Sequence, residues 1–325
     1  MRAAPRPLSV PQKACGWSMG TDATGRKERQ MSTGAKLTEG AQVRSTDWTT
    51  PLLEVTPPFA PAGVVVLAKM ESMNPGLSVK DRVASFGLTR RLRDDPGLRD
   101  GIFVEASSGN TAVGLALAAA RMGVRAWLFV PASAGAARIA RIRRLGARLT
   151  VTPAREGTDG AQRRAGEAGL LRGCVYLNQH ASASNPAVHV LSTGPEIWKQ
   201  SGGLLDGFAA AVGTGGTLLG AGGYIRRRSP GTVTLGAVPA RGERILGIRR
   251  LDPQAIPLHR RLGGIGMVGV SRRRALELSR WVADRRGFPV GPSSGAALEA
   301  ALRLGAELGG GVVATVFPDH GFNYI

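Results

Sequence analysis

From Val64 onward, short apolar runs alternate with amphipathic stretches, and this alternation limits the folds that the chain can adopt. The runs predict strands at 64–68, 102–105, 126–130, 148–151, 175–177, 208–212, 233–237 and 312–317. The stretches between them predict helices at 79–93, 110–121, 138–145, 160–168, 188–200, 217–227, 272–286 and 294–304. Repeated strand–helix units form parallel sheets covered on both faces, and this many strands suggests two sheets. We therefore expect an α/β protein that binds its ligands at the carboxyl ends of the strands, between two domains.

The chain is long enough for two cores, because it has 325 residues of which 43% are hydrophobic. Residues 1–45 differ from the rest, since they are rich in Pro, Gly, Ser, Thr, Arg and Lys without apolar periodicity. Such a segment cannot bury enough apolar surface to offset the entropy of ordering, so we predict a disordered basic tail there. Met1, Met19 and Met31 are all possible translation starts.

Composition also bears on location and partners. No apolar run reaches the roughly 18 residues that span a bilayer, and Cys15 and Cys174 give neither a disulfide framework nor metal-ligand spacing. We expect a cytoplasmic protein without a metal site. The net charge of +20 raises the question of nucleic acid, but the arginines are spread along helical patterns and their runs are not interleaved with aromatic residues. We expect neither nucleic acid nor a membrane as a partner.

One lysine stands where a helix should begin. Lys80 lies in the pentapeptide 78–82, Ser-Val-Lys-Asp-Arg, after a Gly-containing turn, in a chain whose basic charge is mostly arginine. A lysine kept at a strand-to-helix turn suggests that a deprotonatable amine is needed, and amine chemistry points to a Schiff base. An ordinary solvated lysine is the alternative.

Three further Gly- or Ser-rich loops each connect a predicted strand to the helix that follows it or open a helix. The loop at 105–111 offers N–H groups and hydroxyls that suit a carboxylate, although a simple helix cap is the alternative. The loop at 213–217, Gly-Thr-Gly-Gly-Thr, suits a small monophosphate, because it lacks both the triphosphate-loop and the dinucleotide-binding spacing. The loop at 291–297 could place a serine against a neutral heterocyclic nitrogen, or could cap its helix.

In order and spacing, these loops resemble the cysteine synthase family, the fold-type II enzymes that depend on pyridoxal 5'-phosphate (PLP). The resemblance runs from Thr50-Pro51-Leu52 to Phe317-Pro318-Asp319 and includes Asn178-Gln179, Asn185-Pro186, His189, residues 193–198 and Gly264-Ile265-Gly266. It implies two three-layer αβα domains with mostly parallel sheets, like the tryptophan synthase β-subunit, and a homodimer. The smaller domain, mobile and carrying the substrate loop, would be 74–185, and the larger would be 46–73 plus 186–325.

The resemblance also implies roles for individual residues. Lys80 would form the Schiff base with PLP, Asn110 would contact the ring hydroxyl, and Ser293 would contact the pyridine nitrogen. The PLP phosphate would lie on Gly213, Thr214, Gly215, Gly216 and Thr217. The substrate carboxylate would be held by Ser107, Ser108, Gly109, Thr111 and Gln179.

These roles imply β-replacement on an activated L-serine through an aminoacrylate, with Lys80 as the base that takes and returns the Cα proton. A serine at the pyridine nitrogen leaves that nitrogen mostly unprotonated and the ring a weaker electron sink, which suits elimination and replacement better than transamination. A sulfur nucleophile would make the protein a cysteine synthase in amino-acid biosynthesis. The alternatives are an amine nucleophile, giving a diaminopropionate-type product in secondary metabolism, and serine or threonine dehydration.

The leaving group stays open between acetyl and phosphate. The segment 244–252 resembles one that, in the O-phosphoserine branch of the family, supplies an arginine for the substrate phosphate. Arg249 is the best match, because an arginine fork binds a phosphate bidentately whereas an acetyl ester needs no such charge.

Overall fold

A computed structural model describes residues 19–21, 27–30, 36–37 and 48–324. The chain divides into two compact units, Met1–Arg44 and Ser45–Ile325. In the first unit three short strands pair in the antiparallel order β1 (Met19–Thr21), β2 (Lys27–Gln30) and β3 (Lys36–Leu37). Most of the tail for which the sequence predicts disorder lies outside the described residues, so that prediction stays untested there.

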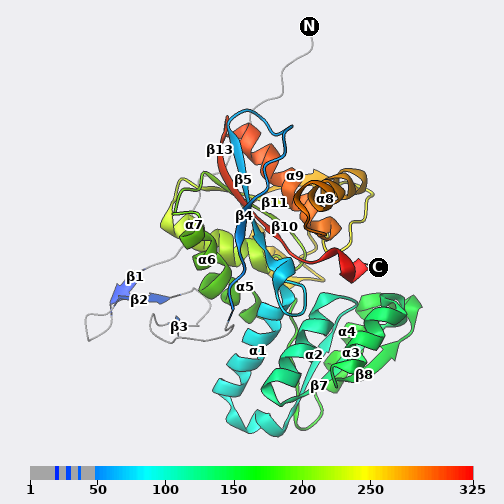
Figure 1. The fold of residues 1–325 in the computed structure, drawn as a ribbon. Coiled ribbons are helices and arrows are strands. Elements are labelled where there is room, and N and C mark those ends of the chain that lie inside the picture. Colours follow the sequence, from blue (N-terminus) through cyan, green and yellow to red (C-terminus); the bar gives the residue numbers. More distant parts are fainter. Residues whose placement is uncertain (1–18, 22–26, 31–35, 38–47, 325) are drawn as a thin grey trace. The chain divides into compact units, whose positions relative to one another are not determined.

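The second unit contains two sheets (Figure 1). The larger has the strand order β12-β11-β10-β13-β5-β4, with bounds β4 Leu52–Glu54, β5 Val64–Met70, β10 Gly207–Ala211, β11 Val233–Pro239, β12 Gly266–Val270 and β13 Gly311–Phe317. The smaller has the order β8-β7-β6-β9, with β6 Ile102–Ala106, β7 Arg125–Pro131, β8 Arg148–Thr152 and β9 Cys174–Tyr176. Every pairing in these two sheets is parallel except that of the edge strand β4 with β5.

The helices of this unit follow the predicted strand–helix alternation. Their bounds are α1 Lys80–Asp94, α2 Asn110–Met122, α3 Ala136–Arg144, α4 Gly157–Ala168, α5 Ser184–Val188, α6 Gly194–Gln200, α7 Gly223–Arg228, α8 Arg272–Arg286 and α9 Pro292–Glu307. Single π-helical turns, His189–Thr193 and Leu218–Gly222, join α5 to α6 and precede α7. Short 3-10 turns include η1 (Glu71–Met73), η7 (Pro257–Leu262) and η8 (Gly321–Tyr324).

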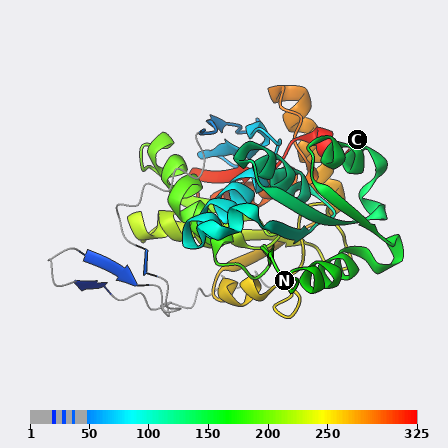
Figure 2. The ribbon, with the colours of Figure 1, turned by 90° about the horizontal axis from the view of Figure 1, so that it is seen from below.

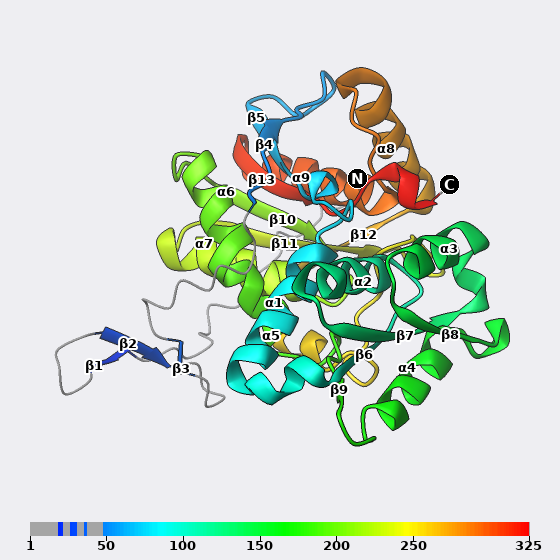
Figure 3. The ribbon, with the colours of Figure 1, turned by 60° about the horizontal axis from the view of Figure 1, so that its bottom comes forward.

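Strand alternation fills a separate core on each face of the larger sheet. Ala209 and Val313 pack in the cluster formed with α8 and α9, whereas their neighbours Phe208 and Ala314 pack in the cluster formed with α6 and α7. The smaller sheet has the same arrangement, with α1, α2 and α3 on one face and α4 on the other. Each sheet is therefore the middle layer of three, and Figure 3 shows α1 and α2 side by side over the smaller one. The predicted α/β class is confirmed.

Besides β1, β2 and β3 of the first unit, drawn in blue in Figure 2, two strands of the second unit were not expected from the sequence. β4 has three residues and pairs at the sheet edge, which is too short for an alternation to show. β12 contains Gly266 and Gly269, and glycine lowers strand propensity. Helix α8, by contrast, begins and ends where predicted, because Ser271 caps its N-terminus and Gly287, with φ of 74°, ends it.

Candidate active site

Lys80 is the first residue of α1, and the chain reaches it through a strained turn. Leu77 has φ of 65°, a left-handed conformation that costs a side-chain-bearing residue free energy. The C-terminal segment supports the turn, because the His320 N–H donates to the Leu77 carbonyl at 3.1 Å and the Val79 N–H donates to the Pro318 carbonyl at 2.8 Å. Burial lowers the pKa of Lys80 to about 8, against the opposing charge of Asp319. A buried amine with this pKa can act as a nucleophile and base near neutral pH.

The loop 107–111 connects β6 to α2 and is placed by side chains from elsewhere. The Arg138 guanidinium donates to the Ser108 carbonyl at 2.9 Å, and Thr158 donates to the Ser108 hydroxyl at 3.3 Å. No side chain caps α2 at Gly109. The N–H groups of the first turn are thus not used by a cap, which favours the anion-binding interpretation over the capping one.

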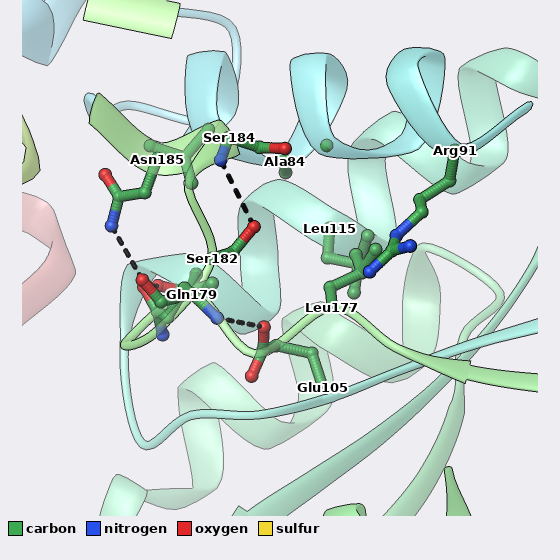
Figure 4. A pocket seen from close by; sticks show the side chains of 12 residues that line it. Ala84, Arg91, Glu105, Leu115, Leu177, Gln179, Ser182, Ser184 and Asn185 are labelled. Carbon is green, nitrogen blue, oxygen red and sulfur yellow. Dashed lines mark hydrogen bonds between the residues drawn. The ribbon is translucent and has the colours of Figure 1, made fainter. Parts of the chain in front are cut away.

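Gln179, predicted to bind the same carboxylate, lies beside this loop. Thr111 donates from its hydroxyl to Gln179 Oε1 at 2.7 Å. The Gln179 N–H donates to Glu105 Oε2 at 3.1 Å, a bond drawn in Figure 4. Glu105 is 2% exposed, and burial raises its pKa to about 7. A small cavity of about 20 Å³, lined by Glu105, Thr111, Gln179, Arg91 and residues of α1, lies behind these side chains and has room for about one water molecule. The structure thus brings Thr111 and Gln179 together.

The loop 213–217 follows β10 and opens the helical run to α7, as predicted for a phosphate site. Gly215 has φ of 84°, and a Cβ on Gly216 would lie 1.9 Å from Asn185 Oδ1, so neither position accepts a side chain readily. Asn185 donates to the Thr214 hydroxyl at 2.9 Å, while its own Oδ1 is buried without a partner. A tight glycine turn with hydroxyls and backbone N–H groups before a helical run fits a phosphate group.

Two histidines contact residues of this loop, His259 at Gly213 and His189 at Thr217. His259 donates from Nε2 to the Gly213 carbonyl at 2.8 Å and accepts from the Asp252 N–H at 2.9 Å on Nδ1, which requires a neutral ring. The ring of His189 lies 3.4 Å from the Thr217 hydroxyl, and burial lowers the pKa of His189 to about 3. Both rings therefore shape the loop without adding charge.

Asn110 and Ser293, the two residues expected to contact the cofactor ring, lie around one carboxylate. Asn110 donates to Asp319 Oδ2 at 2.6 Å, and Ser293 donates to Asp319 Oδ1 at 3.3 Å. Helix α9 has no side-chain cap at Gly291, so Ser293 does not serve as the cap that the sequence left possible. Lys80 lies close enough for its charge to lower the pKa of Asp319, which burial raises. The predicted ring contacts and the lysine thus meet at one place.

Arg249, the residue predicted to bind a substrate phosphate, is at the surface of the protein. Its side chain is exposed, and its N–H donates to the Val212 carbonyl at 2.8 Å. The charges of Arg249 and Lys80 both lower the pKa of His180, which burial brings to about 4. Arg249 and Lys80 therefore both lie within electrostatic reach of His180.

Several residues of the site had no predicted role. Asn185 and His189 are part of the family resemblance, and their contacts with the phosphate loop explain why. Nothing in the local sequence pattern pointed to Glu105, His259 or Asp319, whose partners are distant in the chain. Within the part of the chain that the structure describes, no group of His, Cys, Asp and Glu could hold a metal ion.

Comparison with known proteins places the chain in a class and then in a family. The sequence profile of the pyridoxal-phosphate dependent enzymes matches residues 43–319, so the chain belongs to this class. Cysteine synthase B of Pseudomonas aeruginosa is 36% identical over 263 residues, covering 80% of this chain and 87% of that protein. The cysteine synthase of Aquifex aeolicus is 36% identical over 295 residues, covering 85% and 88%. The protein is a PLP-dependent enzyme of the cysteine synthase family.

A solved structure agrees with this assignment. The crystal structure of the O-acetylserine dependent cystathionine β-synthase from Helicobacter pylori matches with a TM-score of 0.77 at 30% identity, covering 85% of this chain and 94% of that one. The fold type, the cofactor and the enzyme class expected from the sequence are confirmed, and so is β-replacement as the reaction class. The O-phosphoserine branch stays a prediction. Among the described residues, no helix is both long enough and apolar enough to cross a membrane.

Proposed function

We propose that the protein is a cysteine synthase that replaces the acetoxy group on Cβ of O-acetylserine with a sulfur nucleophile, releasing acetate. The observation that carries the proposal is the meeting of Lys80, Asn110 and Ser293 around the buried Asp319 carboxylate, together with a glycine-rich loop suited to a phosphate after β10 of the larger sheet. The relatives named cysteine synthase and the structural neighbour named as O-acetylserine dependent support the sulfur nucleophile and the acetyl donor. They do not favour the amine nucleophile or the dehydratase.

The residues present fit PLP. Lys80 would hold its aldehyde carbon, Asn110 the ring hydroxyl and Ser293 the ring nitrogen, while Gly213, Thr214, Gly215, Gly216 and Thr217 would bind the phosphate through N–H groups and hydroxyls. When bound, PLP withdraws electrons from the substrate Cα and so allows a β-substituent to leave.

The chain's own groups would do the rest. Ser107, Ser108, Gly109, Thr111 and Gln179 would hold the substrate carboxylate at the positive end of α2. The Lys80 amine would take the Cα proton and return it after the nucleophile has added, for which a pKa of about 8 is well matched to neutral pH. Arg138 would keep the Ser108 loop closed over the substrate and so exclude water.

The first test concerns the cofactor. The purified protein with PLP should absorb near roughly 410 nm, as expected for a lysine-bound cofactor, and Lys80→Ala should lose this band while the exposed variant Lys199→Ala keeps it. A wild-type protein that shows no such band after incubation with PLP and removal of the unbound cofactor by dialysis would refute the proposal. The second test concerns the reaction: O-acetylserine with sulfide should give cysteine by mass, and hydroxylamine or glutamate in place of sulfide should give no faster product.

O-Phosphoserine is a second candidate donor, and the position of Arg249 favours it. This cation lies close enough to His180 to affect its pKa, as Lys80 does, so it could reach a phosphate on the substrate. If it binds that phosphate, Arg249→Ala should lower kcat/KM for O-phosphoserine by about 10-fold or more and leave that for O-acetylserine unchanged. Equal loss with both donors would count against a phosphate role.

The domain limits and the assembly also remain proposals. The smaller sheet lies within residues 102–176 and the larger within 52–54, 64–70 and 207–317, which supports a smaller domain of 74–185. We propose that this domain moves against the rest when substrate binds. Small-angle scattering with and without substrate would measure that closure. A homodimer and a cytoplasmic location are expected from the family, and sedimentation and cell fractionation would test them.

A further inference from the structure

Asp319 lies at the centre of the cofactor-ring site, although the sequence assigned it no role. It follows β13 and is 2% exposed. Its carboxylate accepts hydrogen bonds from Asn110 (2.6 Å), Ser293 (3.3 Å) and the Tyr324 hydroxyl (2.5 Å). Asn110 comes from α2, which packs on the smaller sheet, and Ser293 comes from α9, which packs on the larger sheet. One carboxylate therefore links the helical layers of the two sheets.

The backbone of the same residue fixes the surrounding loops. Asp319 pairs with Ser78 in an isolated bridge, two residues before Lys80, and its carbonyl accepts from the Gly291 N–H at 3.0 Å. A Cβ on Gly291 would lie 2.2 Å from Asp319 Oδ1, so the glycine lets the carboxylate approach the start of α9. The position of Asp319 is therefore set from both sides, independently of its side-chain bonds.

A buried carboxylate whose direct partners are neutral donors is costly, and burial raises the pKa of Asp319. If this position served packing alone, leucine or alanine would fill it without the free-energy cost of burying a charged group. Ser293 has one hydroxyl proton, and Asp319 is an acceptor for it. The ring nitrogen of the cofactor would compete for that same proton.

We propose that Asp319 is a positioning residue of the cofactor site, which orients Asn110 and Ser293 toward the ring and competes with the ring nitrogen for the Ser293 proton. This inference rests on the proposed function, because it assumes that these two residues face the PLP ring. The sequence predicts that Ser293 keeps the ring nitrogen mostly unprotonated, and this inference adds Asp319 as a second group that acts on that nitrogen through Ser293. The strength of the carboxylate as an acceptor then helps to set how electron-withdrawing the ring is.

The test is Asp319→Asn in the PLP-bound enzyme. Asn110 and Ser293 donate to different oxygens of the carboxylate, so the amide, which keeps only one of these oxygens as an acceptor, loses one of the two bonds. We expect the dissociation constant for PLP to rise about 10- to 100-fold, as for the loss of one charge-assisted hydrogen bond, and the visible absorbance maximum to shift. Asp206→Asn, an exposed position whose carboxylate bonds the first part of the same strand at Val312, is the matched control and should change neither.

A merely structural role would weaken binding without involving Ser293. The decisive comparison is therefore Asp319→Asn in a Ser293→Ala background, where the spectral shift should largely disappear because the shared proton is gone. A shift of undiminished size there, or wild-type affinity and spectrum in Asp319→Asn, would overturn the proposal. If Asp319→Asn does not fold, Tyr324→Phe leaves the carboxylate in place with one donor fewer, and an unchanged spectrum would equally overturn it. A wild-type enzyme that binds no PLP would instead refute the proposed function.

Discussion

Four charged side chains at the start of α1, three of them fully buried, offer the sharpest test of what holds Lys80 in place. Arg82, two residues after the lysine, is fully buried and lies between Glu71 (2.7 Å) and Glu196 (2.6 Å). Lys69 of β5, also fully buried, pairs with Glu196 at 2.7 Å. The charges balance, and the guanidinium holds the pKa of Glu71 at about 2 despite burial. We predict that these ion pairs behave as one unit, which anchors α1 to the larger sheet.

Lys69→Met removes one charge and keeps the side-chain volume. The Lys69 amine donates to the Thr50 carbonyl and to Gln200 Oε1 (2.8 Å), in addition to its pair with Glu196. Breaking a buried ion pair from one side costs about 3–5 kcal/mol. We expect the lower end, about 3 kcal/mol, because Glu196 keeps two bonds from Arg82 and is 13% exposed. Glu196→Gln should cost a similar amount, since it leaves two cations facing Glu71.

The double variant separates a coupled network from independent contacts. Lys69→Met with Glu196→Gln leaves the Arg82–Glu71 ion pair, which carries no net charge. The double variant should therefore lose about 2 kcal/mol less stability than the sum of the losses in the two single variants. The measurement is the free energy of unfolding from urea titrations of the cofactor-free proteins, followed by tryptophan fluorescence. The exposed pair Arg90–Asp94 on α1 is the matched control, and its two variants should each change stability by less than about 0.5 kcal/mol. Losses at Lys69 and Glu196 that simply add would refute the reasoning.

Further predictions concern Lys80 and the phosphate loop. Burial lowers the pKa of Lys80 from 10.5 to about 8. Between pH 8 and pH 10.5, therefore, Lys80 carries a proton in the unfolded chain that it lacks in the folded, cofactor-free protein. Stability should thus rise with pH through that window. Lys80→Met should therefore be more stable than wild type by about 3 kcal/mol at pH 7 and by about 1 kcal/mol at pH 10; urea titrations that give the same difference at both pH values would contradict this. Gly216→Ala should abolish PLP binding in equilibrium dialysis, because its Cβ would meet Asn185 at 1.9 Å, whereas Gly223→Ala, whose nearest contact is 3.6 Å away, should bind normally.

The sequence was informative wherever one local pattern decided the outcome. Strand–helix alternation predicts that ligand-binding loops follow the carboxyl ends of parallel strands, and the loops at 107–111 and 213–217 do lie after β6 of the smaller sheet and β10 of the larger sheet. Local pattern also located α8 through its caps. It missed β12, whose strand is made by pairing with β11 in spite of two glycines. It also missed the role of Asp319, whose partner Asn110 is 209 residues away.

The scarcity of lysine could not by itself separate a catalytic amine from a structural one, because it applies equally to Lys69 and Lys80. Burial lowers the pKa of both. Their partners differ: the Lys69 amine is committed to Thr50, Gln200 and Glu196, so its protons are used and no lone pair is available to attack a carbonyl. The favourable electrostatic partner of Lys80 is Asp319, which already accepts hydrogen bonds from three other side chains. An amine becomes a nucleophile when burial destabilises its charge and no carboxylate is free to restore it, and of these two lysines only Lys80 meets both conditions.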